Sequence, residues 1–132
     1  MTWTLVAAMV LLLTQGRTTE EGVYSDAQAK RGEQTYAKAC ASCHAADLSG
    51  SGQAPALGDA EFNKEWDGQP LSDLFARIQA TMPADAPGAL QPAEAADVMA
   101  FIFAKAHLPA GATDLPSETA ALKSITYASP RP

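Results

Sequence analysis

Apolar residues recur along the chain three or four positions apart, which is the spacing of one helix face. In residues 71–80 they form one clear stripe, made up of Leu71, Leu74, Phe75 and Ile78. Residues 92–105 show the same spacing, with Phe101 at the centre of the apolar side. A further helix is expected from Asp26 into the cysteine pair that follows it. These patterns predict an all-α fold of about three main helices joined by loops.

Residues that favour helix starts precede or open each of these stretches. Ser25, with Gln28 three positions later, forms a capping-box pattern before the first helix. Ser72 or Asp73 suits the start of the second helix, and Pro92 suits the first turn of the third. The three helices are therefore expected to begin near residues 26, 71 and 92.

The N-terminus runs from Trp3 to Leu13 with almost no polar residue. This run has the length of a signal-peptide apolar region and is short for a membrane-spanning helix. We therefore expect residues 1–22 to be a signal peptide cleaved near Gly16 to Gly22, or an N-terminal anchor that stays uncleaved. A buried helix of the domain is the remaining alternative. Residues 17–24 are expected to form a mobile linker.

The length of 132 residues suits one domain, which we place at residues 23–108. Residues 109–132 are rich in Pro, Ala and Ser, and we expect them to pack on this domain as a C-terminal tail. The expected anchors of the tail are Leu115, Leu122, Ile125 and Tyr127. The formal net charge of −6 argues against a nucleic-acid surface and favours partners that carry basic patches.

The candidate chemistry lies in the segment Cys40-Ala41-Ser42-Cys43-His44. It has the Cys-x-x-Cys-His spacing at which c-type haem is attached. On a helix, Cys40, Cys43 and His44 project from one face, so two thiols can form thioethers with the porphyrin vinyl groups. The imidazole then falls under the iron as an axial ligand. Much of the 47% apolar content is small alanine, so a buried porphyrin would supply missing apolar bulk.

Three other uses of the cysteines are less well supported. A thioredoxin-like redox pair follows a strand and precedes a helix, whereas here a helix comes first and a Gly/Ser loop follows. A zinc site needs three or four protein ligands, and the only other histidine is His107. A disulfide that closes so small a loop constrains little of the unfolded chain. The motif therefore favours haem.

Met82 is the candidate for the second iron ligand. It lies 38 residues after His44, where the helix ends before Pro83 and a thioether can be aimed at iron. A core methionine is the alternative for this position. Met99 falls on the third helix and is expected to belong to the core, and His107 at the end of that helix is expected to face solvent.

Pro55 is the candidate partner of the iron-binding imidazole. Proline has no N–H, but its carbonyl can accept a hydrogen bond. A metal-bound histidine usually donates its other N–H to such an acceptor, which fixes the tautomer and the orientation of the ring. The Gly/Ser-rich segment around Pro55 is expected to be a loop.

With these residues named, residues 26–107 resemble the class I cytochromes c, especially small bacterial single-haem members and the cytochrome domains of quinoprotein dehydrogenases. The resemblance rests on Gly32 and Tyr36, on the cysteine motif, on Pro55-Ala56-Leu57, on Met82-Pro83 and on residues 97–102. It implies that Gly32 and Tyr36 meet Phe101 where the first and last helices cross. It also implies that Pro55 accepts the His44 N–H and that Met82 is the sixth ligand. Gln91 departs from the family, where Ser or Thr commonly caps the last helix.

The resemblance implies an electron carrier rather than an enzyme. One covalently attached haem c, with iron held by His44 and Met82, would pass single electrons between exported redox proteins. Partners of this kind include a quinoprotein dehydrogenase as donor and a terminal oxidase as acceptor, in the periplasm, with membrane attachment only if the N-terminal segment is retained. The alternatives are a dedicated cytochrome subunit of a periplasmic quinoprotein dehydrogenase and, from another class, a haem peroxidase or ligand sensor.

Overall fold

The computed structural model describes residues 16–132, so the apolar run at residues 3–13 lies outside the described residues. The helices are α1 (Asp26–Ala39), α2 (Ala41–His44), α3 (Ala60–Trp66), α4 (Leu71–Thr81), α5 (Pro92–Lys105) and α6 (Thr119–Leu122), preceded by a 3-10 turn at Thr19–Glu21. The strands are β1 (Arg17–Thr18) and β2 (Ile125–Thr126). The all-α prediction is confirmed, and its three main helices correspond to α1, α4 and α5.

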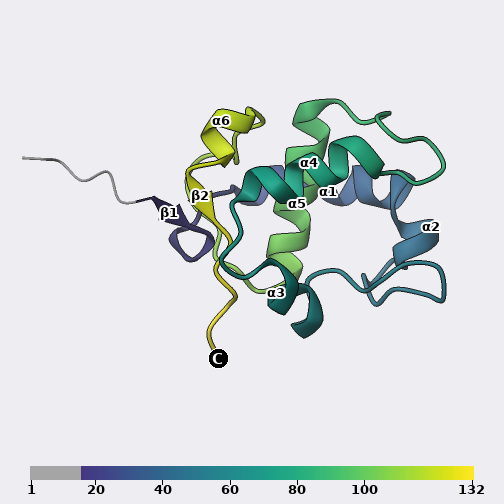
Figure 1. Ribbon diagram of the computed structural model, residues 1–132, viewed down its shortest axis with the longest axis horizontal. Coiled ribbons are helices and arrows are strands. Elements are labelled where there is room, and N and C mark those ends of the chain that lie inside the picture. Colours follow the sequence, from purple (N-terminus) through teal and green to yellow (C-terminus); the bar gives the residue numbers. More distant parts are fainter. Residues whose placement is uncertain (1–15) are drawn as a thin grey trace, which may run out of the picture.

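Helices α1 and α5 cross at close range at the centre of the fold (Figure 1). Gly32 permits this approach, because a Cβ atom at its position would lie 1.8 Å from the carbonyl oxygen of Asp97 and 3.0 Å from the Cβ of Phe101. One turn later the Tyr36 ring packs against the Phe101 ring, with centroids 5.2 Å apart. The predicted contact of Gly32 and Tyr36 with Phe101 is therefore present.

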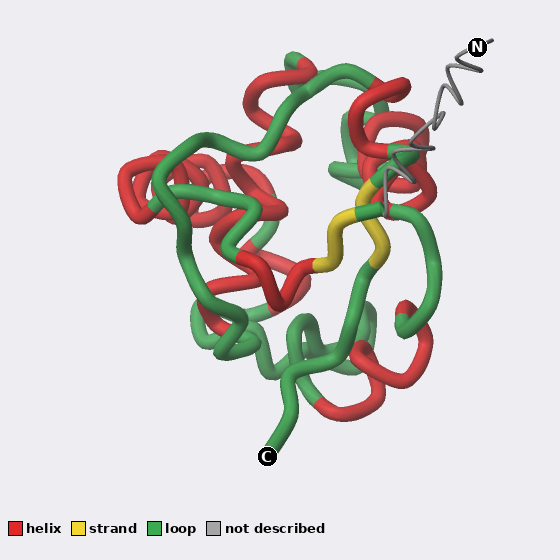
Figure 2. Tube along the Cα trace, turned by 90° about the vertical axis from the view of Figure 1, so that its left-hand side faces the viewer, coloured by secondary structure: helices red, strands yellow, loops and turns green. Residues whose placement is uncertain are grey.

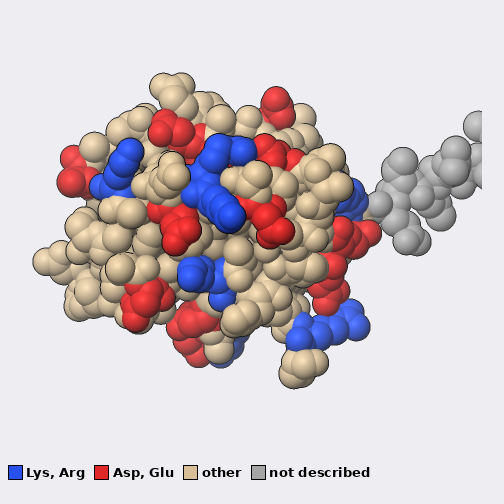
Figure 3. Space-filling view, turned by 180° about the vertical axis from the view of Figure 1, so that it is seen from behind, with Lys and Arg blue, Asp and Glu red and all other residues tan. Residues whose placement is uncertain are grey.

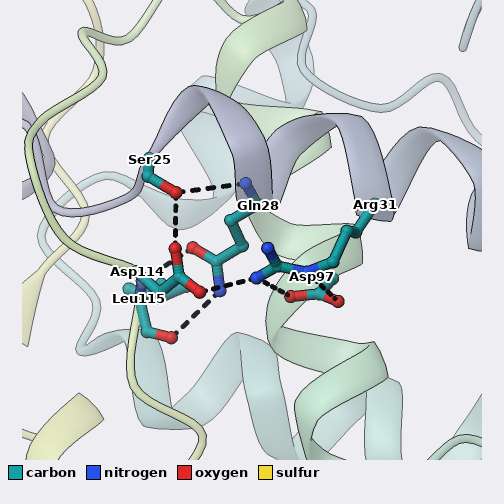
Figure 4. Close-up of polar contacts among 6 residues, drawn as sticks. All are labelled: Ser25, Gln28, Arg31, Asp97, Asp114 and Leu115. Atoms are coloured by element: carbon teal, nitrogen blue, oxygen red, sulfur yellow. Dashed lines mark hydrogen bonds and ion pairs between the residues drawn. The ribbon is translucent and has the colours of Figure 1, made fainter.

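The start of α1 is tied to the C-terminal tail. The backbone N–H of Gln28 donates to the Ser25 hydroxyl at 3.1 Å, so Ser25 caps the helix as predicted. The Gln28 side chain does not complete the capping box. It is buried, donates to the Leu115 carbonyl at 3.0 Å and accepts from the Leu115 N–H at 2.6 Å (Figure 4). The local prediction fails here because the tail, 87 residues away, needs partners for both backbone groups.

Arg31 joins α1 to α5 and to the tail (Figure 4). Its guanidinium lies 3.3 Å from Asp97 and 2.6 Å from Asp114. The Ser25 hydroxyl, which also donates to Asp114, and the Arg31 charge hold the pKa of the Asp114 carboxyl below its ordinary value. Because Arg31 and Asp114 are about half exposed, water screens the pair, which therefore contributes little to stability.

The starts of α4 and α5 differ from the prediction in detail. Helix α4 already begins at Leu71, so neither Ser72 nor Asp73 is its cap, but Asp73 places a negative charge in the first turn, where it suits the helix start. At α5 the backbone N–H of Gln91 donates to the Glu94 carboxylate at 3.0 Å. Glu94 thus provides an acceptor for the backbone N–H of Gln91, the position where the family commonly has Ser or Thr.

The prediction of a mobile linker at residues 17–24 is wrong. Strand β1 pairs in parallel with β2 from the other end of the chain, as Figure 2 shows. Thr19 is fully buried, and its hydroxyl donates to the Ala128 carbonyl at 2.8 Å and accepts from the Ala128 N–H at 2.9 Å. Val23 and Tyr24 are also buried. These partners are about 100 residues away in sequence, so a local pattern does not indicate them.

The C-terminal tail packs on the domain through the residues expected from the sequence. All four expected anchors are at most 3% exposed: Leu115, Leu122, Ile125 and Tyr127. Helix α6 contacts α4, and β2 runs beside β1 at the end of the molecule opposite α2 (Figure 1). The tail is therefore part of the folded body.

Charged side chains of both signs are interspersed over the face of the molecule seen from behind in Figure 3. The whole chain carries a formal net charge of −6. Among the helices of residues 16–132, none combines the length and the apolar character that a membrane crossing requires.

Candidate cofactor site

The cysteine motif forms a tight turn at the end of α1. Cys40 ends the helix, and the next residues form the short α2, in which the N–H of His44 donates to the Cys40 carbonyl at 3.0 Å. This helical turn brings Cys40, Cys43 and His44 to the wall of one cavity. The one-face geometry expected of the motif is therefore realised in the chain itself.

The cavity has a volume of about 600 Å³. Its large apolar wall residues come from the loop after α2, from α3, from α4 and from the segment that follows α4. They are Leu57, Phe62, Trp66, Leu74 and Met82. The structure thus brings the two thiols, the imidazole and the Met82 thioether, all singled out in the sequence, to the same apolar space.

His44 is held in one orientation by Pro55. The ring is 8% exposed, and its Nδ1 lies 2.8 Å from the Pro55 carbonyl oxygen. A carbonyl oxygen only accepts hydrogen bonds, so Nδ1 carries the proton. The lone pair of His44 is then on Nε2, the nitrogen free to bind a metal.

The loop between His44 and Leu57 is itself pinned to the motif. The Tyr36 hydroxyl donates to the Ala45 carbonyl at 2.6 Å, and the Ser51 hydroxyl donates to the Cys43 carbonyl at 2.7 Å. Burial, with smaller contributions from nearby negative groups, raises the pKa of Tyr36 to about 12. Tyr36 therefore stays a neutral hydrogen-bond donor at neutral pH, and the loop holds Pro55 opposite the imidazole.

The surroundings of the two cysteines do not favour a redox-active pair. They are not joined to each other, and both are partly exposed toward the cavity. Burial raises the pKa of the Cys40 thiol to about 11. A redox-active thiol needs a lowered pKa, because the thiolate is the nucleophile. This environment favours the covalent haem over thiol exchange.

Met82 follows α4 directly, and its N–H donates to the Ile78 carbonyl at 3.0 Å. Its side chain is half-buried and lies at the cavity wall. Met99, by contrast, is fully buried in α5, and His107 is exposed at the end of that helix. Neither Met99 nor His107 lines the cavity. The sequence expectation for these two alternatives therefore agrees with their positions.

Arg77 also lines the cavity and was not among the predicted site residues. Its guanidinium lies 5.0 Å from the centre of the Trp66 ring and 3.4 Å from the Glu65 carboxylate. The signal was available, because Arg77 stands three positions after Leu74 and shares its helix face. The cation thus covers Trp66 at the cavity rim.

The residues present fit a covalently attached haem. The thiols of Cys40 and Cys43 and the imidazole of His44 line one wall of the cavity. The Met82 thioether lines the same cavity, and the remaining wall is largely apolar. Iron in c-type cytochromes accepts nitrogen from histidine together with sulfur from methionine. Elsewhere in residues 16–132, no three His, Cys, Asp or Glu side chains gather where they could hold a metal ion.

Residues 27–102 match the protein family described as cytochrome c oxidase, cbb3-type, subunit III. Among solved structures, the chain is similar to the sulfane dehydrogenase SoxCD from Paracoccus pantotrophus, with a TM-score of 0.51 and 18% sequence identity. That likeness covers 82% of this chain and 59% of the other. No curated protein matches the chain.

Proposed function

Because the chain belongs to the cytochrome c family of cbb3-type oxidase subunit III, we propose that it carries single electrons between exported redox proteins. It is a class I cytochrome c, and its cofactor is haem c attached at Cys40 and Cys43. Haem iron supplies a one-electron couple between its ferrous and ferric states. The chain's own part would be to hold the group, supply the protein ligands of its iron and exclude water.

One observation carries this proposal: His44, oriented by Pro55, and Met82 line the same cavity. His44 Nε2 and Met82 Sδ would hold the iron of the haem. With both ligands supplied by the chain, the iron would offer no open position to a substrate. A methionine thioether also raises the reduction potential relative to a second histidine. This arrangement favours an electron carrier over a haem peroxidase or a ligand sensor.

The test is an optical spectrum of the holoprotein, oxidised and reduced, made with haem-attachment machinery. A pyridine haemochrome spectrum of the c type is expected, together with an absorbance band near the red edge of the oxidised spectrum that reports the iron–sulfur bond. Met82→Leu, which keeps the side-chain volume, should abolish this band and let carbon monoxide bind the reduced protein. Met99→Leu is the matched control, because Met99 is buried away from the cavity.

Two results would overturn the assignment. One is a red-edge band that persists in Met82→Leu. The other is ready binding of carbon monoxide by the unaltered reduced protein at neutral pH, which would place it among ligand-binding haem proteins instead.

A second candidate function is that of a dedicated cytochrome subunit of a periplasmic dehydrogenase, of the quinoprotein type or another. It is favoured by the similarity in fold to a chain of the SoxCD dehydrogenase. Purification of the native protein separates the two functions. A free monomer supports the mobile carrier, whereas constant co-purification with one large dehydrogenase supports the dedicated subunit.

We further propose that the chain is exported to the periplasm, with its apolar N-terminal run as a signal peptide or a retained anchor. Attachment of c-type haem outside the cytoplasm, expected for this family, supports export. The packing of Thr19 and Val23 favours processing at or before Gly16, because later cleavage removes β1 from its partner β2. Cell fractionation and the mass of the mature N-terminus test this proposal.

A further inference from the structure

Helix α3 forms one wall of the cavity, and α4 supports it on one side through Arg77, which lies over Trp66 and beside Glu65. Phe62 and Trp66 of this helix line the cavity. No other helix of the described chain contacts α3 extensively. A helix of seven residues is not stable by itself in water. The position of this wall therefore also depends on the segments that cover the other side of α3.

The last residues of the chain cover that side. The Tyr127 hydroxyl donates to Asn63 Oδ1 at 2.5 Å, and the Ser129 hydroxyl donates to the Asn63 carbonyl at 3.2 Å. Just beyond α3, the N–H of Gly68 donates to the Tyr127 carbonyl at 2.9 Å. The chain end thus binds both the middle of α3 and the turn that follows it.

Tyr127 also connects α3 to the centre of the fold. Its ring packs edge-on against Phe62, with centroids 5.9 Å apart, and at a tilt against Phe103 of α5, with centroids 5.7 Å apart. Tyr127 is 1% exposed, and burial, with a smaller effect of the Asp67 charge, raises the pKa of its phenol well above the ordinary value. It is therefore a neutral donor, and Phe62 lies between it and the cavity.

The chain end is itself fixed by the N-terminal segment. The Thr19 hydroxyl makes two hydrogen bonds to Ala128, the neighbour of Tyr127. Arg131 lies 3.0 Å from the Glu20 carboxylate. These contacts lie outside residues 27–102, the part of the chain that matches the family. The residues that hold the chain end, and through it α3, therefore lie outside the segment that carries the haem motif.

We propose that Tyr127 is a positioning residue that holds Phe62 and α3 against the haem and thereby raises its reduction potential. The inference rests on the proposed function, since it concerns the environment of that haem. The oxidised haem carries one more positive charge than the reduced haem, and burial disfavours the more highly charged form. If Phe62 withdraws, water approaches the haem and stabilises the oxidised form.

The test is a potentiometric titration of the holoprotein and two variants. Tyr127→Phe removes only the hydrogen bond to Asn63, and Tyr127→Leu also removes the ring that supports Phe62. At the same applied potential, the ratio of reduced to oxidised protein should be about threefold lower in Tyr127→Phe, and about tenfold lower in Tyr127→Leu, than in the unaltered protein. For one electron these are downward shifts of about 28 mV and about 59 mV.

Tyr24→Phe is the matched control. It also removes one buried phenol hydrogen bond, but this bond joins Tyr24 to the Leu108 carbonyl at 2.6 Å rather than to α3. Its potential should stay at the value of the unaltered protein. If Tyr127→Leu yields no holoprotein, Asn63→Ala, which removes the acceptor, takes its place beside Tyr127→Phe.

Unchanged potentials in the Tyr127 and Asn63 variants, with only a loss of stability, would show that Tyr127 is a structural anchor and overturn the inference. That result would leave the proposed function standing, because the haemochrome spectrum and the red-edge band report the cofactor and its ligands independently. Loss of the red-edge band in Tyr127→Phe would also contradict the inference, since Tyr127 is placed beside α3 and not at Met82.

Discussion

The crossing of α1 and α5 offers the sharpest test of the fold, through the substitution Gly32→Ala. The added Cβ would lie 1.8 Å from the carbonyl oxygen of Asp97 and 2.5 Å from its carbonyl carbon. Both are backbone atoms of α5, so no side-chain rotation relieves the contact. The two helices must move apart by more than 1 Å to reach the 3.0 Å below which real Cβ contacts are essentially never found.

Two opposing effects set the magnitude. Alanine is better than glycine inside a helix by about 1 kcal/mol. Overpacking of a tight contact costs about 1–3 kcal/mol and occasionally more. The clash here is with backbone, and separation also loosens the Tyr36–Phe101 contact, so the upper end of that range applies. Gly32→Ala should therefore lose roughly 2 kcal/mol of the free energy of unfolding.

The assay is equilibrium denaturation of the holoprotein, followed by circular dichroism. Gly52→Ala is the control, because a Cβ at Gly52 meets nothing within 4 Å, and it should leave stability nearly unchanged. A Gly32→Ala protein as stable as the Gly52→Ala protein would refute the reasoning, since the helices would then not cross at the distance described.

Three further outcomes are expected. Thr19→Ala should lose about 2 kcal/mol of stability in urea denaturation, because it leaves both backbone groups of Ala128 without their partner; Thr19→Ser should lose much less, and equal losses would contradict this. Burial raises the pKa of Tyr36 to about 12, so above about pH 10 the unfolded chain releases a proton that the folded chain keeps. Stability should therefore fall between pH 10 and 12, and less steeply in Tyr36→Phe; identical slopes would argue against it. Replacing Cys40 and Cys43 together by alanine prevents covalent attachment, so removal of the haem exposes the apolar wall of a cavity of about 600 Å³ to water. Because domains are only marginally stable, cooperative unfolding should be lost in near-ultraviolet circular dichroism once haem is removed.

The sequence was sufficient for the parts of the fold that depend on local pattern. The apolar stripe of residues 71–80 and the spacing in residues 92–105 predicted α4 and α5, because a helix buries one face at a fixed period. The Cys-x-x-Cys-His motif predicted that its three side chains project to one side, because they lie within about one helical turn, and in the structure they line the same cavity. The pairing of His44 with Pro55 was predicted from the acceptor chemistry of the Pro55 carbonyl and from the family resemblance, and the structure places His44 Nδ1 2.8 Å from that carbonyl oxygen.

Features that depend on distant partners were missed or misjudged. The linker expected at residues 17–24 is fixed by β2, and the Gln28 amide binds Leu115 instead of the helix start. Helix α3 was not predicted, because it is short and its two large apolar residues, Phe62 and Trp66, are only one turn apart. Its start does carry a signal, since the Asp59 carboxylate accepts from the Phe62 N–H at 2.9 Å.

Because the haem is attached by local residues while α3 is held by distant ones, the reduction potential can change independently of the attachment. The residues that attach the haem lie within one turn, so substitutions elsewhere leave the attachment chemistry in place. The cavity wall at α3 is instead positioned by Tyr127, which belongs to a tail held by Thr19 at the opposite end of the chain. A change at either chain end can therefore alter the environment of the iron without touching a ligand. The two ends can in this way set the potential while Cys40, Cys43 and His44 stay the same.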